Sequence, residues 1–337
     1  MMNESLSKNN SRNKQYIAFL ETCKKKDNIT VKNIAHFGGK LMKNAKVHPH
    51  FFTNHTLLNN ALYLTFFSLK LPYEFRNSSY LNRKISAQEA LEIFTLFERR
   101  IAERIPVEYI TQEAYYLENK FFVNNNQLVP RSLMHTQFKA FLAKMPWENH
   151  RVLDMCAGTG CIGITLALLN PHIKVDLADI SNEALEVARI NIKNHHLEDR
   201  VRCIQTNMFE NIDDKYDLII SSPPYVTEAD YLVQPEEVKN EPKIALTAGE
   251  DGLDIVHVFL KQSKSYLNTN GRLIIEVGYP AAKLLKKKYP KLPLKWLKCK
   301  STLGYDPMTD WILVLAQLLI RWTSHLDSIF VCEAKYL

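Results

Sequence analysis

The sequence lacks the features that mark zinc-binding, disulfide-rich and membrane-spanning proteins. Its six cysteines are scattered and none stands in a Cys-x-x-Cys pair, so we expect free thiols and no metal site. The polar N-terminus contains no apolar stretch of the kind found in a signal peptide. The longest late apolar run, residues 311–320, is too short to span a bilayer. These absences predict a cytoplasmic protein with no membrane partner.

The chain has only a modest excess of one charge, with 43 Lys and Arg against 36 Asp and Glu and a formal net charge of +7. Such an excess is compatible with binding RNA or an acidic surface, yet it is common in proteins that bind neither. Hydrophobic residues make up 46% of the chain, which is typical of a protein with a packed core. Charge alone therefore assigns no partner.

The N-terminal third of the chain is helical in pattern. Residues 1–30 are polar and predict a flexible extension. From residue 31 to 102, apolar residues recur at a spacing of three to four. Ser86, with Glu89 three positions later, forms a capping box, which predicts that a helix begins there. We expect residues 31–102 to form a small helical domain.

A break at Pro106 ends the helical pattern, and a connecting hairpin is expected over residues 103–135. Two short strand-like runs occupy residues 115–117 and 120–123. The polar stretch Asn124-Asn125-Asn126 follows the second run, and we interpret it as the turn of the hairpin.

Strands and helices alternate over residues 136–315, which is typical of a mostly parallel sheet covered by helices. Residues 316–337 form a tail to which the pattern assigns no structure. The expected strands are 152–154, 174–178, 201–204, 218–221 and 272–277, and the expected helices are 161–169, 182–194 and 253–267.

A glycine-rich loop follows the first of these strands. Gly158, Gly160 and Gly163 match the G-x-G-x-x-G pattern, so a nicotinamide-dependent enzyme has to be considered. Asp154 ends the strand before the loop, where a carboxylate would repel a pyrophosphate but could accept hydrogen bonds from an amino-acid-bearing ligand. Asp179 ends the second strand, where it could accept both ribose hydroxyls of either an NAD-type or an adenosine ligand. The loop therefore favours a ligand other than a dinucleotide without excluding one.

The segment Ser222-Pro-Pro-Tyr225 comes directly after another buried strand. Pro223 and Pro224 fix the backbone and lack N–H groups, so the carbonyl oxygens around them can accept hydrogen bonds. An amide or exocyclic amine needs such acceptors, because its nitrogen lone pair is delocalised and its two N–H groups must be held during attack on a methyl group. The Tyr225 ring could stack on the planar substrate group.

The two segments together resemble a known enzyme class. Residues 154–162 are similar to the cofactor loop of class I methyltransferases, and Ser222-Pro-Pro-Tyr225 resembles their amino-methyltransferase motif. The resemblance implies S-adenosyl-L-methionine as cofactor and an α/β fold of class I, Rossmann-like type. In that fold a mostly parallel seven-stranded sheet would be joined to the small N-terminal helical domain.

Three further stretches, 104–111, 128–132 and 241–253, resemble the protein-glutamine N5-methyltransferases that act on a large-subunit ribosomal protein, the L3 protein. The substrate would be the free protein or a ribosome-assembly intermediate, and the helical domain would recognise it. The resemblance implies that catalysis rests on Ser222, Pro223, Pro224 and Tyr225. It also implies a cofactor site formed by Asp154, Cys156, Ala157, Gly158, Gly160, Asp179 and Asn207.

Two residues depart from the family pattern and keep alternatives open. Ser222 stands where the glutamine-modifying branch usually has asparagine, and a Ser-Pro-Pro-Tyr motif is also found in DNA amino-methyltransferases that act on N4 of cytosine. Asn207 stands where an aspartate is usual, which predicts weaker binding of the adenine amino group. The alternatives are a DNA amino-methyltransferase of the N4-cytosine or N6-adenine type, a release-factor glutamine methyltransferase, and a non-catalytic protein that binds the cofactor.

Overall fold

The computed structural model forms two compact units, which are described separately. The first comprises residues Met1–Gln112 together with Pro235–Asn240, and the second comprises Glu113–Gln234 and Glu241–Leu337. No helix in the part of the chain that the structure describes is long and apolar enough to cross a membrane. The described residues are 14–21, 29–49, 56–72, 78–134, 150–290, 295–298 and 314–318.

The first unit is a small bundle of helices, each of the three longer ones with a side-chain cap at its N-terminus. Thr30, Thr56 and Ser86 accept a backbone hydrogen bond from the third residue of the helix that follows. The expected capping box of Ser86 and Glu89 is confirmed, and its helix extends three residues beyond Arg100. The helices are α2 (Val31–Asn44), α3 (Leu57–Ser68), the 3₁₀ helix η1 (Ser78–Asn82), α4 (Ala87–Glu103) and α5 (Val107–Thr111).

The expectation of a flexible extension over residues 1–30 is wrong for one stretch. Residues 14–21 form a helix. Tyr16 is buried and stacks on Phe94 of α4, with the ring centroids 4.0 Å apart. A buried aromatic ring offsets the entropy lost when a polar segment becomes ordered, which composition alone does not show. Residues 1–13 and 22–28 of the expected extension lie outside the described residues.

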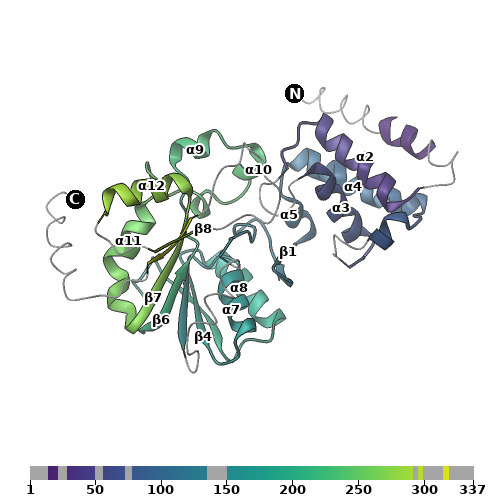
Figure 1. Cartoon of the computed structure of the whole chain (residues 1–337). Coiled ribbons are helices and arrows are strands. Elements are labelled where there is room, and N and C mark those ends of the chain that lie inside the picture. Colours follow the sequence, from purple (N-terminus) through teal and green to yellow (C-terminus); the bar gives the residue numbers. More distant parts are fainter. Residues whose placement is uncertain are drawn as a thin grey trace. The chain divides into compact units, whose positions relative to one another are not determined.

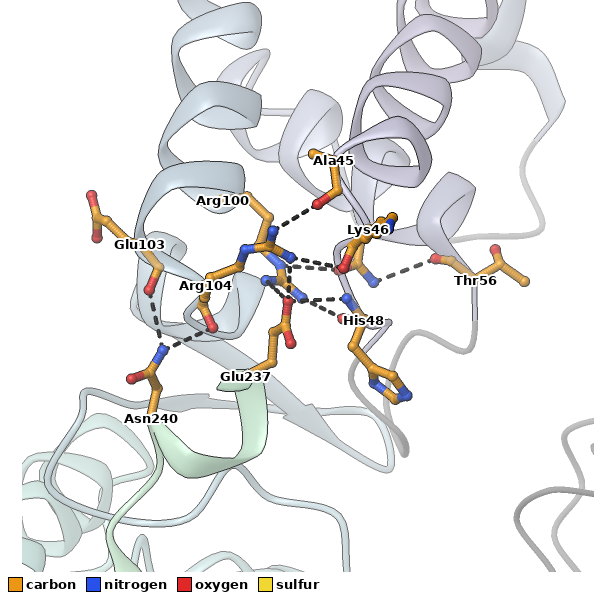
Figure 2. Close-up of polar contacts among 10 residues, drawn as sticks. Ala45, Lys46, His48, Thr56, Arg100, Glu103, Arg104, Glu237 and Asn240 are labelled. Carbon is orange, nitrogen blue, oxygen red and sulfur yellow. Dashed lines mark hydrogen bonds and ion pairs between the residues drawn. The ribbon is translucent and has the colours of Figure 1, made fainter. Parts of the chain in front are cut away.

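One short helix joins the first unit from far along the chain, which the sequence did not indicate. Helix α10 (Glu236–Lys239) places Glu237 beside two arginines of the helical bundle (Figure 2). Glu237 Oε1 lies 3.1 Å from Arg104 Nη1 and 3.7 Å from Arg100 Nη1, and it accepts a hydrogen bond from the His48 backbone N–H. Arg100 and Glu237 are buried, so this cluster is a structural part of the unit.

The second unit begins with a hairpin that differs from the expected one. Strands β1 (Glu113–Tyr116) and β2 (Asn119–Phe122) pair antiparallel, so the turn lies between the two strand-like runs rather than after them. The expected turn at Asn124-Asn125-Asn126 is instead a side-chain turn, in which the Asn124 Oδ1 accepts from the Asn126 N–H. An asparagine run is equally suited to both kinds of turn, which explains the error.

The core of the second unit is a seven-stranded sheet in the order β5-β4-β3-β6-β7-β9-β8. The first five strands of this order run parallel, and β9 and β8 are antiparallel at the other edge. This order confirms the α/β class I methyltransferase fold. The strands are β3 (Arg151–Met155), β4 (Lys174–Asp179), β5 (Val201–Gln205), β6 (Tyr216–Ser221), β7 (Leu267–Val277), β8 (Lys295–Lys298) and β9 (Val314–Leu318).

Helices cover both faces of this sheet (Figure 1). On one face α7 (Cys161–Leu169) and α8 (Asn182–Asn194) pack in a hydrophobic core, and on the other face α11 (Asp254–Gln262) and α12 (Tyr279–Lys288) form a second core. The expected bounds of α7 and α8 are confirmed. The expected helix 253–267 is shorter, because its last turn is a 3₁₀ helix, η3 (Ser263–Tyr266), that leads into β7. The tail expected at 316–337 lies outside the described residues beyond residue 318.

The strand order reverses between β3 and β6. The chain moves outward from β3 through β4 to β5 and then returns to the other side of β3 with β6. In open α/β sheets the loops at such a reversal leave the carboxyl ends of two adjacent strands and diverge, which forms the crevice where ligands bind. Here those two loops are the glycine-rich loop and the Ser-Pro-Pro-Tyr segment.

Candidate active site

The two segments singled out from the sequence leave the same edge of the sheet side by side. Met155, the last residue of β3, is paired in register with Ser221, the last residue of β6. The Ser221 hydroxyl donates a hydrogen bond of 2.6 Å to the Met155 carbonyl oxygen, and both groups are buried. The glycine-rich loop and the Ser-Pro-Pro-Tyr segment therefore begin from directly adjacent points.

The glycine-rich loop has a backbone conformation that suits the close approach of a ligand. Cys156, Gly158 and Gly160 all have positive φ angles, of 59°, 54° and 76°. A Cβ atom at Gly158 would meet no other atom within 4 Å, so the backbone there faces open space. The Ala157 N–H donates to the Ala178 carbonyl oxygen at the end of β4, which ties the loop to the next strand. Burial raises the pKa of the Cys156 thiol, which makes it a poor nucleophile.

Asp154 occupies the helix terminus where a dinucleotide would place its pyrophosphate. Its Oδ2 accepts a hydrogen bond of 2.8 Å from the Gly163 N–H in the first turn of α7. Its Oδ1 has no hydrogen-bond partner among the described residues, although the side chain is completely buried. Burial, partly opposed by the Gly163 hydrogen bond, raises the pKa of Asp154 to about 7. A carboxylate already held at the helix N-terminus disfavours a phosphate ligand there.

Asp179 is the last residue of β4, and Asn207 follows the end of β5 by two residues. Asp179 accepts hydrogen bonds from the Gly158 and Ser181 N–H groups at 2.8 and 3.0 Å, and burial raises its pKa. Asn207 is exposed and its Nδ2 donates to Glu210 Oε1 at 2.8 Å, which leaves its Oδ1 directed as an acceptor. The structure thus places Asp179 at Gly158, and the Thr206 N–H, which donates to the Asp179 carbonyl oxygen at 2.9 Å, holds the residue before Asn207 at the end of β4.

The Ser-Pro-Pro-Tyr segment is held in place by backbone contacts from residues 246–252. The N–H groups of Tyr225 and Val226 both donate to the Leu246 carbonyl oxygen, at 3.2 and 2.9 Å. Gly252 has a φ of +73°, and a Cβ there would lie 2.5 Å from the Tyr225 carbonyl oxygen, so only glycine fits. Burial raises the pKa of Tyr225, and the ring therefore stays neutral at physiological pH.

The three stretches that resembled the glutamine methyltransferases differ in location. Glu241 accepts hydrogen bonds from Arg131 Nη1, at 2.6 and 2.8 Å, and from the Val129 N–H at 3.0 Å, which joins the second stretch to the third. The third stretch contains Leu246 and Gly252, which hold Tyr225 in place. Arg104 of the first stretch lies in the helical unit, where it hydrogen-bonds the Ala45 and Lys46 carbonyl oxygens (Figure 2).

Glu276 is a residue of this site that sequence reasoning missed. It lies on β7, which is adjacent to β6, and its side chain is almost completely buried. The carboxyl accepts a hydrogen bond from the Ser132 hydroxyl at its Oε2. Ser221 is paired in register with Ile275, so Ser222 leaves β6 beside Glu276, and its hydroxyl lowers the pKa of that carboxyl. Burial raises the pKa of Glu276 to about 7, while these two hydroxyls, Arg131 and the Leu133 N–H oppose the increase. A glutamate in the apolar run Leu273–Val277 was the signal that could have found it.

The described part of the chain contains no group of three or more His, Cys, Asp and Glu side chains that could hold a metal ion. Of the six cysteines expected to be free thiols, Cys156, Cys161 and Cys203 lie among the described residues and are free, and the other three lie outside them.

Comparison with known proteins points to the same chemistry. Residues 134–240 match the family described as Methyltransferase small domain. A ribosomal protein uL3 glutamine methyltransferase of Neisseria meningitidis serogroup A is 37% identical over 252 residues, which cover 73% of this chain and 82% of the relative. A protein of the same name from Bordetella pertussis is 35% identical over 263 residues, covering 77% of this chain and 86% of the relative.

Proposed function

The chain belongs to the family of ribosomal protein uL3 glutamine methyltransferases, and from this premise we propose that it methylates the side-chain nitrogen of a glutamine in uL3. The methyl donor is S-adenosyl-L-methionine. The observation that carries the proposal is the position of the two loops: the glycine-rich loop and the Ser-Pro-Pro-Tyr segment leave paired residues of β3 and β6. A methyl group held over the first loop can therefore face an amide held by the second.

The residues present suit S-adenosyl-L-methionine, whose positively charged sulfonium supplies an activated methyl group. Gly158 leaves open space where the backbone would approach the ligand, and the loop residues Cys156, Ala157 and Gly160 shape that surface. The unpartnered Asp154 Oδ1 suits an ammonium group. Carboxylate and amide oxygens of Asp179 and Asn207 suit the ribose hydroxyls and the adenine amino group.

The catalytic role falls to Ser222, Pro223, Pro224 and Tyr225. Acceptor oxygens along this segment hold the two N–H groups of the substrate amide, so that its lone pair can turn toward the methyl group. With S-adenosyl-L-methionine bound, the amide nitrogen would gain the methyl group, the electron pair of the broken carbon–sulfur bond would stay on the sulfur of the neutral leaving group, and the proton that the nitrogen loses would pass to solvent. The neutral Tyr225 ring stacks on the amide plane.

The helical unit is the part of the chain that would recognise the protein substrate. The work would take place in the cytoplasm, on free uL3 or on a ribosome-assembly intermediate. The domains proposed from the sequence are 31–102 for the helical domain and 136–315 for the methyltransferase domain, joined by residues 103–135. The compact units of the structure divide after Gln112 instead, so that the hairpin belongs to the second unit.

The proposal is tested by supplying labelled S-adenosyl-L-methionine with purified uL3, with a peptide-release factor and with DNA in parallel. We expect label on a single glutamine of uL3, located by mass spectrometry, and none on DNA or the release factor. Tyr225→Ala should reduce the transfer roughly tenfold or more by loss of stacking. Label on cytosine or adenine, or on the release factor, would refute the substrate. Cofactor binding by calorimetry without transfer to any of the three would support a non-catalytic role.

A further inference from the structure

The serine at position 222 poses a chemical problem for the proposed function, on which this inference rests. An amide substrate needs a hydrogen-bond acceptor at that position. A serine hydroxyl can act either as donor or as acceptor, and its hydrogen rotates to suit the surroundings. Nothing in Ser222 alone determines which role it plays toward the substrate.

Glu276 is the group that can fix the orientation of the Ser222 hydroxyl. Its carboxyl is almost completely buried on the strand next to β6, where it accepts a hydrogen bond from the Ser132 hydroxyl. Ser222 lies beside it, because the preceding residue, Ser221, is paired in register with Ile275. An ionised carboxylate can only accept hydrogen bonds, so a serine hydroxyl that bonds to it must donate its one hydrogen. The Ser222 oxygen then keeps its lone pairs for another donor.

We propose that Glu276 is a positioning residue: it takes up the hydroxyl hydrogen of Ser222 and so holds the Ser222 oxygen as the acceptor for the substrate N–H. The pair Ser222 and Glu276 thereby does what the amide oxygen of asparagine would do at position 222. Ser132, from the stretch before the sheet, holds the same carboxyl from another direction.

The arrangement depends on the charge of Glu276, and the groups that face it determine its titration. Arg131 favours the ionised form, as do the two serine hydroxyls and the Leu133 N–H. Burial opposes it and brings the pKa to about 7. The other ionisable groups affected by Glu276 are Tyr225 and Cys161, which stay neutral in this range. Below pH 7 the protonated carboxyl has a hydrogen of its own to donate to Ser222, and the fixed orientation is lost.

The first test is the pH dependence of kcat with saturating uL3 and S-adenosyl-L-methionine. We expect an acidic limb with a midpoint near pH 7, because the glutamine amide itself does not titrate there. Ser132→Ala removes one hydrogen bond that favours the carboxylate, so its limb should move to higher pH. Glu276→Gln removes the titrating group and should abolish the limb. A limb that is unchanged in both variants would overturn the proposal.

The second test is a double-mutant cycle. Glu276→Leu at pH 8.5 should lower kcat roughly tenfold while the KM for S-adenosyl-L-methionine stays constant. Ser222→Ala leaves no hydroxyl to orient, so adding Glu276→Leu to it should cause no further loss. Losses that multiply in the double variant would show that Glu276 acts independently of Ser222, which contradicts the proposal.

Two other outcomes, a variant that does not fold and a wrong substrate, can be distinguished from failure of this inference. If Glu276→Leu or Glu276→Gln does not fold, the comparison of wild type with Ser222→Ala still decides: the acidic limb must be present in the first and absent from the second. Absence of transfer to uL3 by the wild type at every pH would refute the proposed function. Normal transfer without an acidic limb would refute only the role of Glu276.

Discussion

Strand β4 carries two aspartates whose hydrogen-bond partners differ in kind. Asp176, three residues before the end, accepts hydrogen bonds from Arg151, Arg202 and Tyr216 at 2.6 to 3.0 Å. Asp179, at the carboxyl end, accepts hydrogen bonds from two backbone N–H groups. Both residues lie on one short strand of one sheet, so the difference arises from the groups that surround each residue.

The same contrast extends across the whole sheet. Near the amino ends of the strands, Arg151 and Arg202 neutralise the buried Asp176, and Asp214 is a second acidic partner of both arginines. At the carboxyl ends, Asp154 and Glu276 are buried with raised pKa values and are hydrogen-bonded chiefly to N–H groups and hydroxyls. One edge of the sheet is therefore organised for stability, and the other keeps acids that cost stability and suit ligand binding.

The largest expected effect is a loss of stability from Asp176→Asn. The substitution turns an oxygen that accepts from Arg151, Arg202 and Tyr216 into a donor that faces three other donors. We expect the free energy of unfolding to fall by about 3 kcal/mol, measured by urea denaturation. The kcat at 20 °C should stay within about twofold of the wild type, since the edge is remote from the loops. A large loss of kcat in folded protein would contradict the division between the two edges.

The opposite result, weaker ligand binding without a loss of stability, is expected for Asp154→Asn. The variant can still accept from the Gly163 N–H, but it presents an NH₂ group where the unpartnered oxygen was. Binding of S-adenosyl-L-methionine, measured by calorimetry, should weaken by about 2 kcal/mol, or roughly 30-fold. The free energy of unfolding should not decrease, because a neutral side chain is easier to bury. A variant that binds normally but unfolds more easily would make Asp154 a structural residue.

The pH dependence of stability sharpens the contrast further. Asp154 and Glu276 have pKa values of about 7 when folded, above those of the unfolded chain, so the folded protein binds more protons between pH 5 and 7. Their contribution therefore favours the folded state at low pH and is lost as the pH rises through 7. Each group adds a slope of at most about 1.4 kcal/mol per pH unit. The slope should be flatter in the double variant Asp154→Asn, Glu276→Gln, and an unchanged slope would refute the assignment.

The smallest effect is expected for Asp214→Asn. Asp214 belongs to the same cluster as Asp176, but it is 41% exposed and pairs with arginines that water also reaches. Screening should limit the loss in the free energy of unfolding to below about 1 kcal/mol. The variant is a matched control for Asp176→Asn, since it changes the charge of the cluster without unpairing a buried acid. A loss as large as that of Asp176→Asn would show that net charge, not burial, stabilises this edge.

Much of the second unit could be predicted because its strands and helices are specified by short stretches of sequence. The strands from β3 to β7 and the helices α7 and α8 follow from short apolar runs, glycines and N-cap residues. The position of Gly158 and Ser222 in loops at the same edge of the sheet agrees with the rule that loops after parallel strands meet at one edge. Their roles as cofactor and catalytic residues remain predictions for the experiments above.

The remaining features depend on contacts between residues that are distant in sequence. Glu276 is recognisable only when β7 lies beside β6 and Ser132 reaches the same carboxyl from 144 positions away. The stacking of Tyr16 on Phe94 likewise joins segments that no local periodicity connects. The hairpin was misplaced because turn-forming residues do not specify which strands they join.

The ion pair between Arg104 and Glu237 has a consequence for folding during synthesis of the chain. The two residues are 133 positions apart, so at ordinary rates of translation Arg104 is synthesised on the order of ten seconds before Glu237. During that interval the helical unit lacks helix α10, and of the two buried acids that favour the charged form of Arg100 only Glu108 has been made. A nascent chain halted before residue 237 should therefore be more sensitive to protease in its helical part than the finished protein.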